Sequence, residues 1–290
     1  MRYTIDNGVL AVTADSLGAE LCAITGKDGT EYLCPDAVRN WDGRSPVLFP
    51  NTGAVRDGYT LVDGKPFPFG QHGFAKKSEF TLSAHSDTAM TFELRWSEKT
   101  LKLYPFRFVL RITYKLESNR LRVLAQVHNE GDKALHASLG FHPGFACPFV
   151  PGETAEDYDI VFPERMTASR LVLRDALVSE TTHLFWNNLS VLPVQEGMFD
   201  GGSFSMTDLS SKAVCLRSRK SGRSITLSFE DYPNLVLWAP REKPITNICI
   251  EPWYGMPDAA DTDHSLKTKP FTFTVEPCGC QELVFTMTLD

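Results

Sequence analysis

The sequence contains no run of 18 or more apolar residues, and its first residues alternate between polar and apolar side chains. A membrane-spanning helix or a secretory signal peptide needs a continuous apolar stretch. Helical periodicity is also scarce, and only the segments 36–42 and 258–267 are expected to form short helices. We therefore predict a cytoplasmic protein with no membrane partner.

Signatures of common cofactor sites and hydrolases are missing as well. There is no Gly-rich phosphate loop, no nucleophile-elbow serine and no His-Glu-x-x-His helix. Of the seven cysteines, only Cys278 and Cys280 are close in sequence, and no second Cys or His pair at ligand spacing accompanies them. Since a structural zinc site needs four ligands, we expect no metal and no organic cofactor.

Lys and Arg residues are not clustered. The net charge of −7 comes from acidic and basic residues mixed along the chain, whereas nucleic-acid-binding proteins gather Lys and Arg on one face. The sequence therefore argues against a nucleic-acid partner and favours a small ligand. Either a monomer or a homodimer agrees with this composition.

The dominant pattern is an alternation of apolar and polar residues. In the segment 106–117, Phe, Leu, Ile and Tyr alternate with Arg, Thr, Lys and Glu, which is typical of a strand with one buried face. The same alternation recurs, between Gly, Pro, Asn or Asp clusters, in the segments 92–96, 225–229, 271–275 and 283–289. Two further β-rich arms flank "NEGD" in the segment 121–141 and predict a hairpin.

These strands predict an all-β fold. With 42% hydrophobic residues the chain is long enough to bury a large core, and no Ser/Gly-rich linker divides it. We predict one domain over residues 1–290, an antiparallel two-sheet sandwich of more than a dozen strands.

Two side chains have unusual surroundings. His142 ends the alternating stretch 135–141 and precedes a Pro-Gly pair that stops the strand, which leaves open space in front of the ring. Glu251 ends the apolar stretch 247–251, where a carboxylate is costly unless it is bonded or functional. Desolvation would raise its pKa from about 4.3 toward the range useful for proton transfer. From the residues alone, a hydrogen-bonded core histidine and a structural carboxylate stay open as alternatives.

Two more residues qualify as candidates. His72, in "GQHGFA", has a glycine within two residues on either side, so a ligand can approach the backbone there. Trp253, next to Pro252, offers an aromatic face for a sugar ring, although it could equally be core. Metal binding by His72, His142 and Glu251 is conceivable, but no short-spaced pair supports it.

Four segments in order, "WDGRSPVLFPNTG", "QHGFAKKSEF", "GFHPGF" and "ICIEPWYGMPD", resemble the aldose 1-epimerase (galactose mutarotase) family, in particular its LacX-type branch. The similarity spans essentially the whole chain. It implies a β-supersandwich with few short helices and a sugar bound in an open cleft on a concave sheet.

The resemblance also implies an isomerase activity and its residues. His142 would be the general acid at the ring oxygen, Glu251 the general base at the C1 hydroxyl, and His72 would bind and polarise the sugar near the ring oxygen. Such a pair interconverts α and β anomers of a hexose or related aldose by opening and reclosing the ring, without a cofactor.

Further substrate contacts follow from the same resemblance. Arg44 and Lys76 align with basic residues that related hexose-6-phosphate epimerases place near the phosphate, and Arg56 lies close to a position where LacX-type sequences commonly have arginine. Gln71 and Trp253 complete the predicted contacts to a sugar or sugar phosphate. The acid that binds substrate in classical mutarotases has no motif here, although Asp200 and Asp208 lie in the corresponding region.

Other functions remain open from the sequence. A hexose-6-phosphate 1-epimerase and a noncatalytic carbohydrate-binding or regulatory protein would share the fold. A glycoside hydrolase or lyase would need two carboxylates across the scissile bond, and only Glu251 presents itself.

Overall fold

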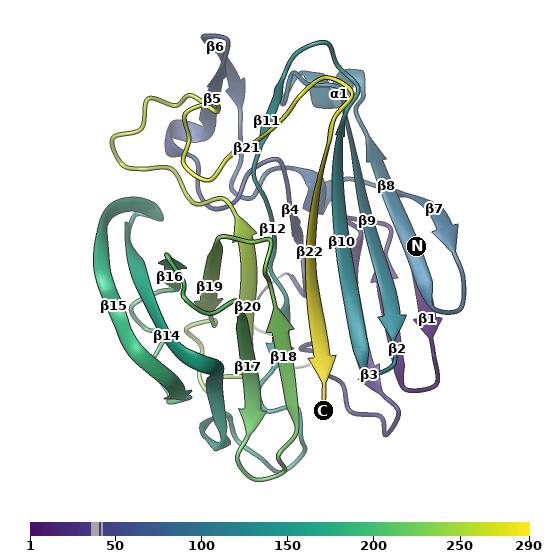
Figure 1. The fold of residues 1–290 in the computed structure, drawn as a ribbon, viewed down its shortest axis with the longest axis vertical. Helices are drawn as coiled ribbons and strands as arrows, with labels where there is room; N and C mark the ends of the chain where they lie inside the picture. Colours follow the sequence, from purple (N-terminus) through teal and green to yellow (C-terminus); the bar gives the residue numbers. More distant parts are fainter. Residues whose placement is uncertain (36–40, 42) are drawn as a thin grey trace.

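The computed structural model describes residues 1–35, 41 and 43–290 and is built almost entirely of β-strands (Figure 1). Fifteen of the described strands form one sheet in which every pairing is antiparallel. Its order is β4 (Val47–Leu48), β12 (Leu139–Phe141), β20 (Asn247–Tyr254), β19 (Asn234–Trp238), β16 (Phe204–Thr207), β14 (Tyr158–Arg174), β17 (Ala213–Ser218), β18 (Ser224–Ser228), β22 (Cys280–Leu289), β10 (Arg120–Asn129), β9 (Phe108–Glu117), β8 (Ala89–Arg95) and β7 (Thr81–His85). Off this path, β13 (Gly144–Ala146) pairs with β20, and β15 (Leu177–Pro193) pairs with β14. The predicted large antiparallel β fold is confirmed.

Smaller elements complete the described part of the chain. They are the sheet β1 (Arg2–Asp6), β2 (Leu10–Asp15) and β3 (Glu20–Gly26), the pair β5 (Tyr59–Val62) and β6 (Lys65–Pro68), the pair β11 (Leu135–Ala137) and β21 (Phe273–Val275), helix α1 (Glu98–Leu101), and the 3₁₀ turns η1 (Arg56–Gly58), η2 (Ala75–Lys77) and η3 (Ala155–Asp157). The segment 258–267 forms turns and isolated bridges instead of the expected helix. The helix expected at 36–42 falls on a segment of which only residue 41 is described.

The hairpin predicted for residues 121–141 is wrong. Strand β10 pairs with β9 and β22, whereas β11 pairs with β21, and β12 pairs with β20 and β4. The turn itself exists, because the Asn129 side chain accepts a hydrogen bond from the Gly131 N–H and donates to the Lys133 carbonyl. The same amide also donates to the Val275 carbonyl, at 2.8 Å. The chain thus leaves β10 toward β21. The sequence did not predict this route, because alternation sets which face of a strand is buried but not which strand it pairs with.

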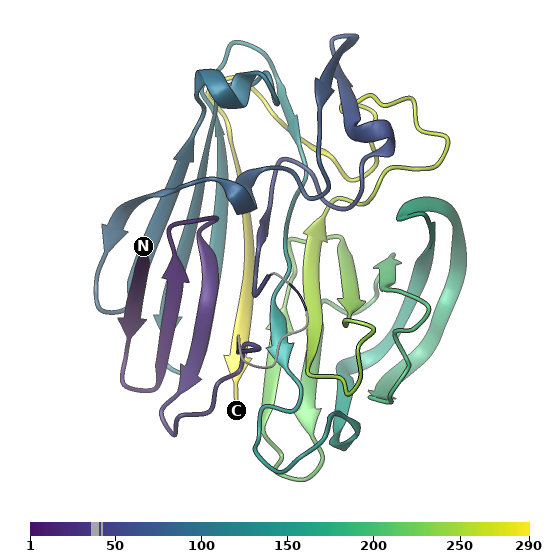
Figure 2. The ribbon, with the colours of Figure 1, turned by 180° about the vertical axis from the view of Figure 1, so that it is seen from behind.

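The β1–β3 sheet covers one face of the part of the large sheet that holds β8, β9 and β10 (Figure 2). Strand β9 shows why, since alternate residues from Leu110 to Leu116 are buried while Lys115 is exposed. The Tyr114 hydroxyl donates to the Ala19 carbonyl at 2.7 Å and joins the two layers. The layers bury the apolar face of β9, which is the main stabilising term in such a core.

The large sheet curls, so that strands distant in its order face each other. The ring of Phe141 on β12 lies 4.8 Å from that of Phe285 on β22, and the ring of Phe49, after β4, lies 5.1 Å from that of Phe108 on β9. Strand β20 is buried along its length up to Trp253. The curl therefore brings the end of β12 and the middle of β20 into the interior.

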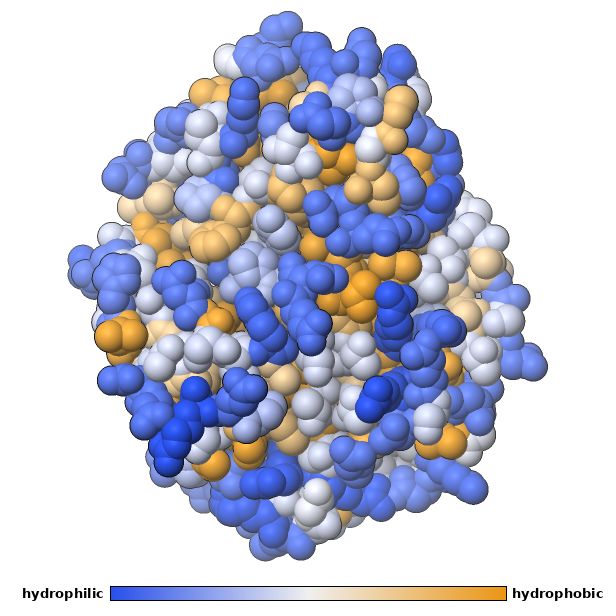
Figure 3. All heavy atoms as spheres, viewed as in Figure 1, coloured by the Kyte–Doolittle hydropathy of each residue, from blue (hydrophilic) through white to orange (hydrophobic). Residues whose placement is uncertain are grey.

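The face of the molecule seen in Figure 1 is mostly polar. On the face seen in Figure 1, hydrophobic residues appear in small groups separated by hydrophilic ones (Figure 3). Within the described residues, no helix is long and apolar enough to cross a membrane.

Candidate active site

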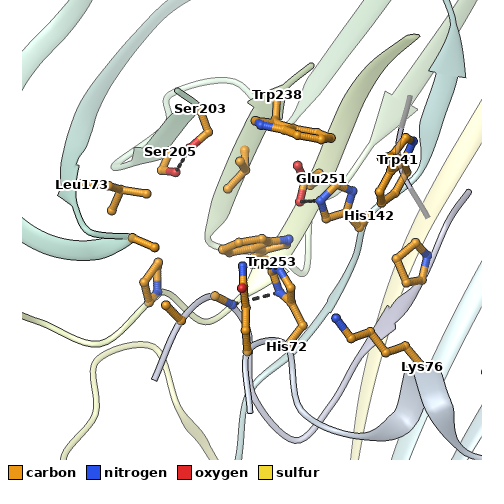
Figure 4. A pocket seen from close by; sticks show the side chains of 17 residues that line it. Trp41, His72, Lys76, His142, Leu173, Ser203, Ser205, Trp238, Glu251 and Trp253 are labelled. Carbon is orange, nitrogen blue, oxygen red and sulfur yellow. Dashed lines mark hydrogen bonds and ion pairs between the residues drawn. The ribbon is translucent and has the colours of Figure 1, made fainter. Parts of the chain in front are cut away.

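A pocket of about 400 Å³ opens beside β19 and β20 (Figure 4). Its size lies within the roughly 300–1,000 Å³ that small-molecule sites occupy. The lining residues are Trp41, Pro46, Gly53, Ala54, Gln71, His72, Lys76, His142, Leu173, Ala176, Ser203, Ser205, Val236, Trp238, Glu251, Trp253 and Pro257. The structure thus brings together His72, His142 and Glu251, which are far apart in the sequence.

His142 and Glu251 form a buried pair at the inner end of the pocket. Glu251 lies in the middle of β20 opposite Val236 of β19, and His142 directly follows β12, where its N–H donates to the Pro46 carbonyl. The His142 Nε2 lies 3.3 Å from Glu251 Oε2, and the two side chains are only 12% and 1% exposed.

The geometry of this contact is not that of a hydrogen bond. Among the described residues, neither Glu251 Oε2 nor His142 Nδ1 has a hydrogen-bond partner. Buried polar atoms are almost always satisfied, so two unsatisfied atoms in residues that line a pocket make this pair a candidate for contact with a ligand.

Burial shifts the two groups in opposite directions. Desolvation raises the pKa of Glu251 well above its usual value of 4.5, partly opposed by the Trp253 indole. Desolvation also lowers the pKa of His142 from 6.5 to about 3, opposed by its own backbone and reinforced by the charge of Lys76. Burial thus favours the neutral form of both groups, a protonated Glu251 carboxyl and an unprotonated His142 imidazole, and in that form the pair holds one transferable proton.

The shift of His142 predicts how stability depends on pH. In the unfolded chain the imidazole binds a proton below pH 6.5, whereas in the folded chain it does so only near pH 3. The unfolded state therefore binds more protons in this window, and the stability contributed by neutral His142 is complete above pH 6.5 and is lost as the pH falls toward 3. Urea unfolding of the wild type and of His142→Gln between pH 7.5 and pH 4 should show the wild type losing more free energy of unfolding. Equal losses in both proteins would contradict this assignment.

His72 is held in one tautomer by Gly53. The Gly53 N–H donates to Nδ1 of the ring at 3.1 Å, and the His72 N–H donates to the Gly53 carbonyl at 3.0 Å. Because Nδ1 is an acceptor, the neutral ring carries its proton on Nε2. Burial and the charges of His142, Lys76 and Lys269 lower the pKa of His72 well below 6.5. The ring is therefore a neutral donor at neutral pH.

The His72 ring lies close to other groups of the site. Its centroid is 5.9 Å from that of His142 and 5.5 Å from that of Trp253, both edge to face. The exposed Gln71 amide contacts Nε2 at 3.3 Å. The structure places the amide nitrogen of Gln71 at this contact, but since His72 Nε2 carries the proton, the amide must turn by 180° for its oxygen to accept the hydrogen bond. An incoming ligand can replace Gln71 and take the hydrogen bond from Nε2.

Lys76, on η2, points its ammonium toward the space near His72 and His142 (Figure 4). It is the one lysine or arginine among the pocket-lining residues that the structure describes. Burial lowers its pKa, with a further contribution from Lys77, whereas Glu20 opposes the shift. The described lining residues thus supply a single, partly desolvated cation.

Three tryptophans form the apolar walls. Trp41 stacks on the His142 ring at 4.7 Å between centroids, and Trp238 meets the same ring edge-on at 5.7 Å. Trp253 is buried beneath the pocket, where a methyl group at Gly140 would lie 2.7 Å from its ring. Trp41 and Trp238 were missed by sequence reasoning. Trp41 belongs to the quoted "WDGRSP" motif, but Trp238 becomes significant only once the β19–β20 register is known.

The end of the pocket away from His142 carries hydroxyl groups. Ser203 Oγ and Ser205 Oγ lie 2.9 Å apart, and Leu173 lies beside them (Figure 4). Ala176 also lines the pocket. Sequence reasoning missed all four, which lack any motif. Neither candidate for the substrate-binding acid lines the pocket, since Asp200 pairs with Lys243 and Asp208 is exposed elsewhere.

Arg44 and Arg56 are not among the residues that line the pocket. The Arg44 N–H donates to Glu20, and the Arg56 guanidinium lies 3.4 Å from Asp57. Their contacts to a substrate therefore stay predictions that this geometry does not favour.

The metal-ligand set that the sequence made conceivable was His72, His142 and Glu251. Among the described residues, the structure instead groups His142 and Glu251 with Cys249, and the ligand atoms of these three lie within 4.8 Å of one another. Zinc binds N, O and S ligands at about 2.0–2.3 Å and needs a thiolate from cysteine. Burial raises the pKa of Cys249 well above 9, so this cluster would have to move and lose a costly proton to hold an ion.

Comparison with known proteins identifies the relatives of this chain. The family model described as aldose 1-epimerase matches residues 1–266. The protein LacX of Lactococcus lactis is 32% identical over 298 aligned residues, which cover 100% of this chain and 99% of LacX.

Two solved structures are similar over their whole length. A galactose mutarotase related enzyme from Lactobacillus acidophilus has a TM-score of 0.91 at 29% identity, with 100% of this chain and 97% of that chain covered. A galactose mutarotase-like protein from Lactobacillus casei has a TM-score of 0.92 at 29% identity, with both chains covered completely. The predicted supersandwich is thereby confirmed, and the chain belongs to the aldose 1-epimerase family.

Proposed function

We propose that this protein is an aldose 1-epimerase that interconverts the α and β anomers of a free hexose or related aldose. The observation that carries the proposal is the His142–Glu251 pair, buried and 3.3 Å apart at the inner end of a pocket of sugar size. Membership of the aldose 1-epimerase family supports the same reaction class.

The reaction needs one base, one acid and room for rotation. Glu251 removes the proton from the C1 hydroxyl while His142 protonates the ring oxygen, so the bond between C1 and the ring oxygen breaks and an aldehyde forms. The aldehyde rotates about the C1–C2 bond, and the ring recloses with both proton transfers reversed. Atoms and charge balance without any redox step.

The proton inventory of the pair fits this cycle. Ring opening starts from protonated His142 and ionised Glu251, a form that differs from the one that burial favours only in which of the two groups carries the proton. After ring opening, His142 is neutral and Glu251 is protonated. Burial favours this form, so the site favours the proton arrangement that accompanies the open-chain aldehyde.

His72 and the tryptophans bind the sugar in this proposal. The Nε2–H of His72 donates to the ring oxygen or a neighbouring hydroxyl, which strengthens the polarisation of the C1–oxygen bond. Trp41, Trp238 and Trp253 offer flat apolar faces to the C–H groups of a pyranose. Ser203 and Ser205 meet hydroxyl groups at the other end.

The charge of the pocket favours a free sugar over a sugar phosphate. A phosphate carries nearly two negative charges and is usually held by arginine forks or several N–H donors. Lys76 is the one cation among the described lining residues, and its pKa is lowered. A hexose-6-phosphate epimerase is the second candidate, supported only by Lys76.

NMR exchange spectroscopy on aldoses and their 6-phosphates separates these candidates. We expect the protein to accelerate anomer exchange of glucose or galactose. The kcat/KM for the free sugar should be about tenfold or more above that for its 6-phosphate, because the described pocket residues offer the phosphate few charged donors. Lys76→Gln should change the ratio of the two kcat/KM values little. Preference for the phosphate, lost in Lys76→Gln, would identify the second candidate instead. Unchanged exchange across the panel would leave a carbohydrate-binding protein, and release of reducing ends from oligosaccharides would indicate a hydrolase.

A further inference from the structure

A buried ion pair lies next to the pocket without lining it. The Lys269 Nζ is 2.7 Å from Asp258 Oδ1, and the two side chains are only 6% and 7% exposed. The other oxygen of Asp258 accepts a hydrogen bond from the Arg56 N–H at 2.9 Å. Desolvation of two buried charges costs several kcal/mol per ion, so such a pair is poor evidence for stability alone.

The same ammonium also orients an amide. Lys269 Nζ donates to Asn51 Oδ1 at 2.5 Å, and Asn51 is fully buried. Because Lys has only donors, the oxygen of the amide must face Lys269 and its NH₂ must face the other way. The Asn51 Nδ2 accordingly donates to the Gly53 carbonyl at 3.0 Å.

Gly53 is the residue that holds His72. Its carbonyl accepts hydrogen bonds from Asn51 Nδ2 and from the His72 N–H, and its own N–H donates to His72 Nδ1. A methyl group at Gly53 would lie 2.6 Å from Pro257, so this turn is also wedged against the residue before Asp258. The contacts therefore run without a gap from Lys269 through Asn51 and Gly53 to the imidazole.

We propose that Lys269 is a positioning residue for His72. Its ammonium, paired with Asp258, fixes the amide of Asn51 and the turn at Gly53, and this turn keeps the His72 ring in the tautomer that presents Nε2–H to the pocket. Asn51 of the motif "PNTG" and Asp258 of the motif "GMPD" thus belong to one hydrogen-bond network, and this network orients His72 of the motif "GQHGF".

The charge of Lys269 acts in the same direction as its hydrogen bond. Together with burial and the charges of His142 and Lys76, it lowers the pKa of His72. A neutral ring is required for a fixed tautomer, since a protonated imidazole donates from both nitrogens and could not accept from Gly53.

The test uses Lys269→Met together with Asp258→Asn, so that no unpaired charge is left in the interior. In ¹⁵N-labelled wild type, long-range ¹H–¹⁵N spectra should show His72 with an acceptor Nδ1 and a proton on Nε2. In the double variant, we expect a mixture of tautomers and a higher pKa of His72. For a sugar that the wild type turns over, kcat should fall by about 10–100-fold, as small misplacements of a reacting group cause.

Two further variants make the outcome decisive. Asn51→Ala keeps the ion pair but removes the link to Gly53, and it should reproduce the tautomer change even if the double variant does not fold. Lys133→Met removes an exposed ion pair to Asp63 and should change neither spectrum nor rate.

A folded double variant or Asn51→Ala with the wild-type His72 spectrum would overturn the proposal, because Lys269 would then only stabilise the fold. The kinetic arm rests on the proposed function, but the tautomer arm does not. A protein without epimerase activity would refute the proposed function and leave the spectra as the test of Lys269.

Discussion

Replacing Glu251 with glutamine is expected to lower kcat for anomer interconversion by about 10²–10⁴-fold, the usual contribution of a positioned proton acceptor. The amide has the same shape but cannot take the proton of the C1 hydroxyl. KM should change little, because the glutamine amide fills nearly the same space as the carboxyl group that it replaces. The rate is measured by polarimetry or NMR exchange with a sugar that the wild type turns over.

The Glu251→Gln substitution should not lower the free energy of unfolding, although it lowers kcat. Glu251 is 1% exposed and has a strongly raised pKa, so its ionisation is costly in the folded state and not in the unfolded chain. Its contribution to stability is complete below about pH 4.5 and is lost as the pH rises toward the folded pKa. Glu251→Gln should therefore be at least as stable as the wild type at pH 8.

Glu31→Gln is the matched control. Glu31 is a partly buried carboxylate whose pKa, like that of the fully buried Glu251, is raised by burial, but its oxygens accept hydrogen bonds from Ile24, Thr25 and Leu33, away from the pocket. We expect kcat within twofold of wild type and a lower stability, because Gln accepts fewer bonds. Equal kinetic losses in both variants would mean that Glu251 has no special role.

Replacing Gly73 with alanine is expected to destabilise the protein by about 3 kcal/mol, as the sum of left-handed strain and overlap in a packed site. Gly73 has φ +67°, and a methyl group there would lie 2.2 Å from the carbonyl oxygen of Phe49. That oxygen accepts hydrogen bonds from the Phe74 and Ala75 N–H groups. The neighbouring His72 would move with the loop. Urea unfolding monitored by tryptophan fluorescence measures the change.

Gly70→Ala is the control in the same loop. A methyl group at Gly70 meets no atom within 4 Å, and its backbone is outside the left-handed region. The free energy of unfolding should stay within about 0.5 kcal/mol of wild type. A comparable loss in both variants would show that any side chain in this loop is harmful and that contact with Phe49 is not the cause.

Much of the site was predictable because its central residues are unusual in their local sequence. Glu251 is a carboxylate in an apolar strand, and His142 ends an alternating stretch before a Pro-Gly pair. The resemblance of short motifs to the family supplied roles for both. Arg44 and Arg56, in contrast, were proposed from position within motifs alone, and the structure does not place them in the lining of the pocket.

Residues without a local anomaly were missed. Trp238 lies two residues after Val236 on the same face of an ordinary apolar strand, and Ser203 and Ser205 follow a Gly pair that is typical of a loop. Lys269 reads as a solvated lysine among polar residues, yet it is buried against Asp258 and Asn51. Their roles depend on partners that are remote in the chain.

By itself, the sequence determined that the chain forms β-strands, which face of each is apolar, and which side chains would be costly to bury. These properties depend on residues one or two positions apart. Only the tertiary structure decided strand partners, the register of β19 with β20, and the route of the chain after Asn129, because alternation is equally satisfied by many pairings. The curl of the large sheet then set which anomalies meet around one pocket, since it is produced by contacts between strands that are distant in both sequence and sheet order.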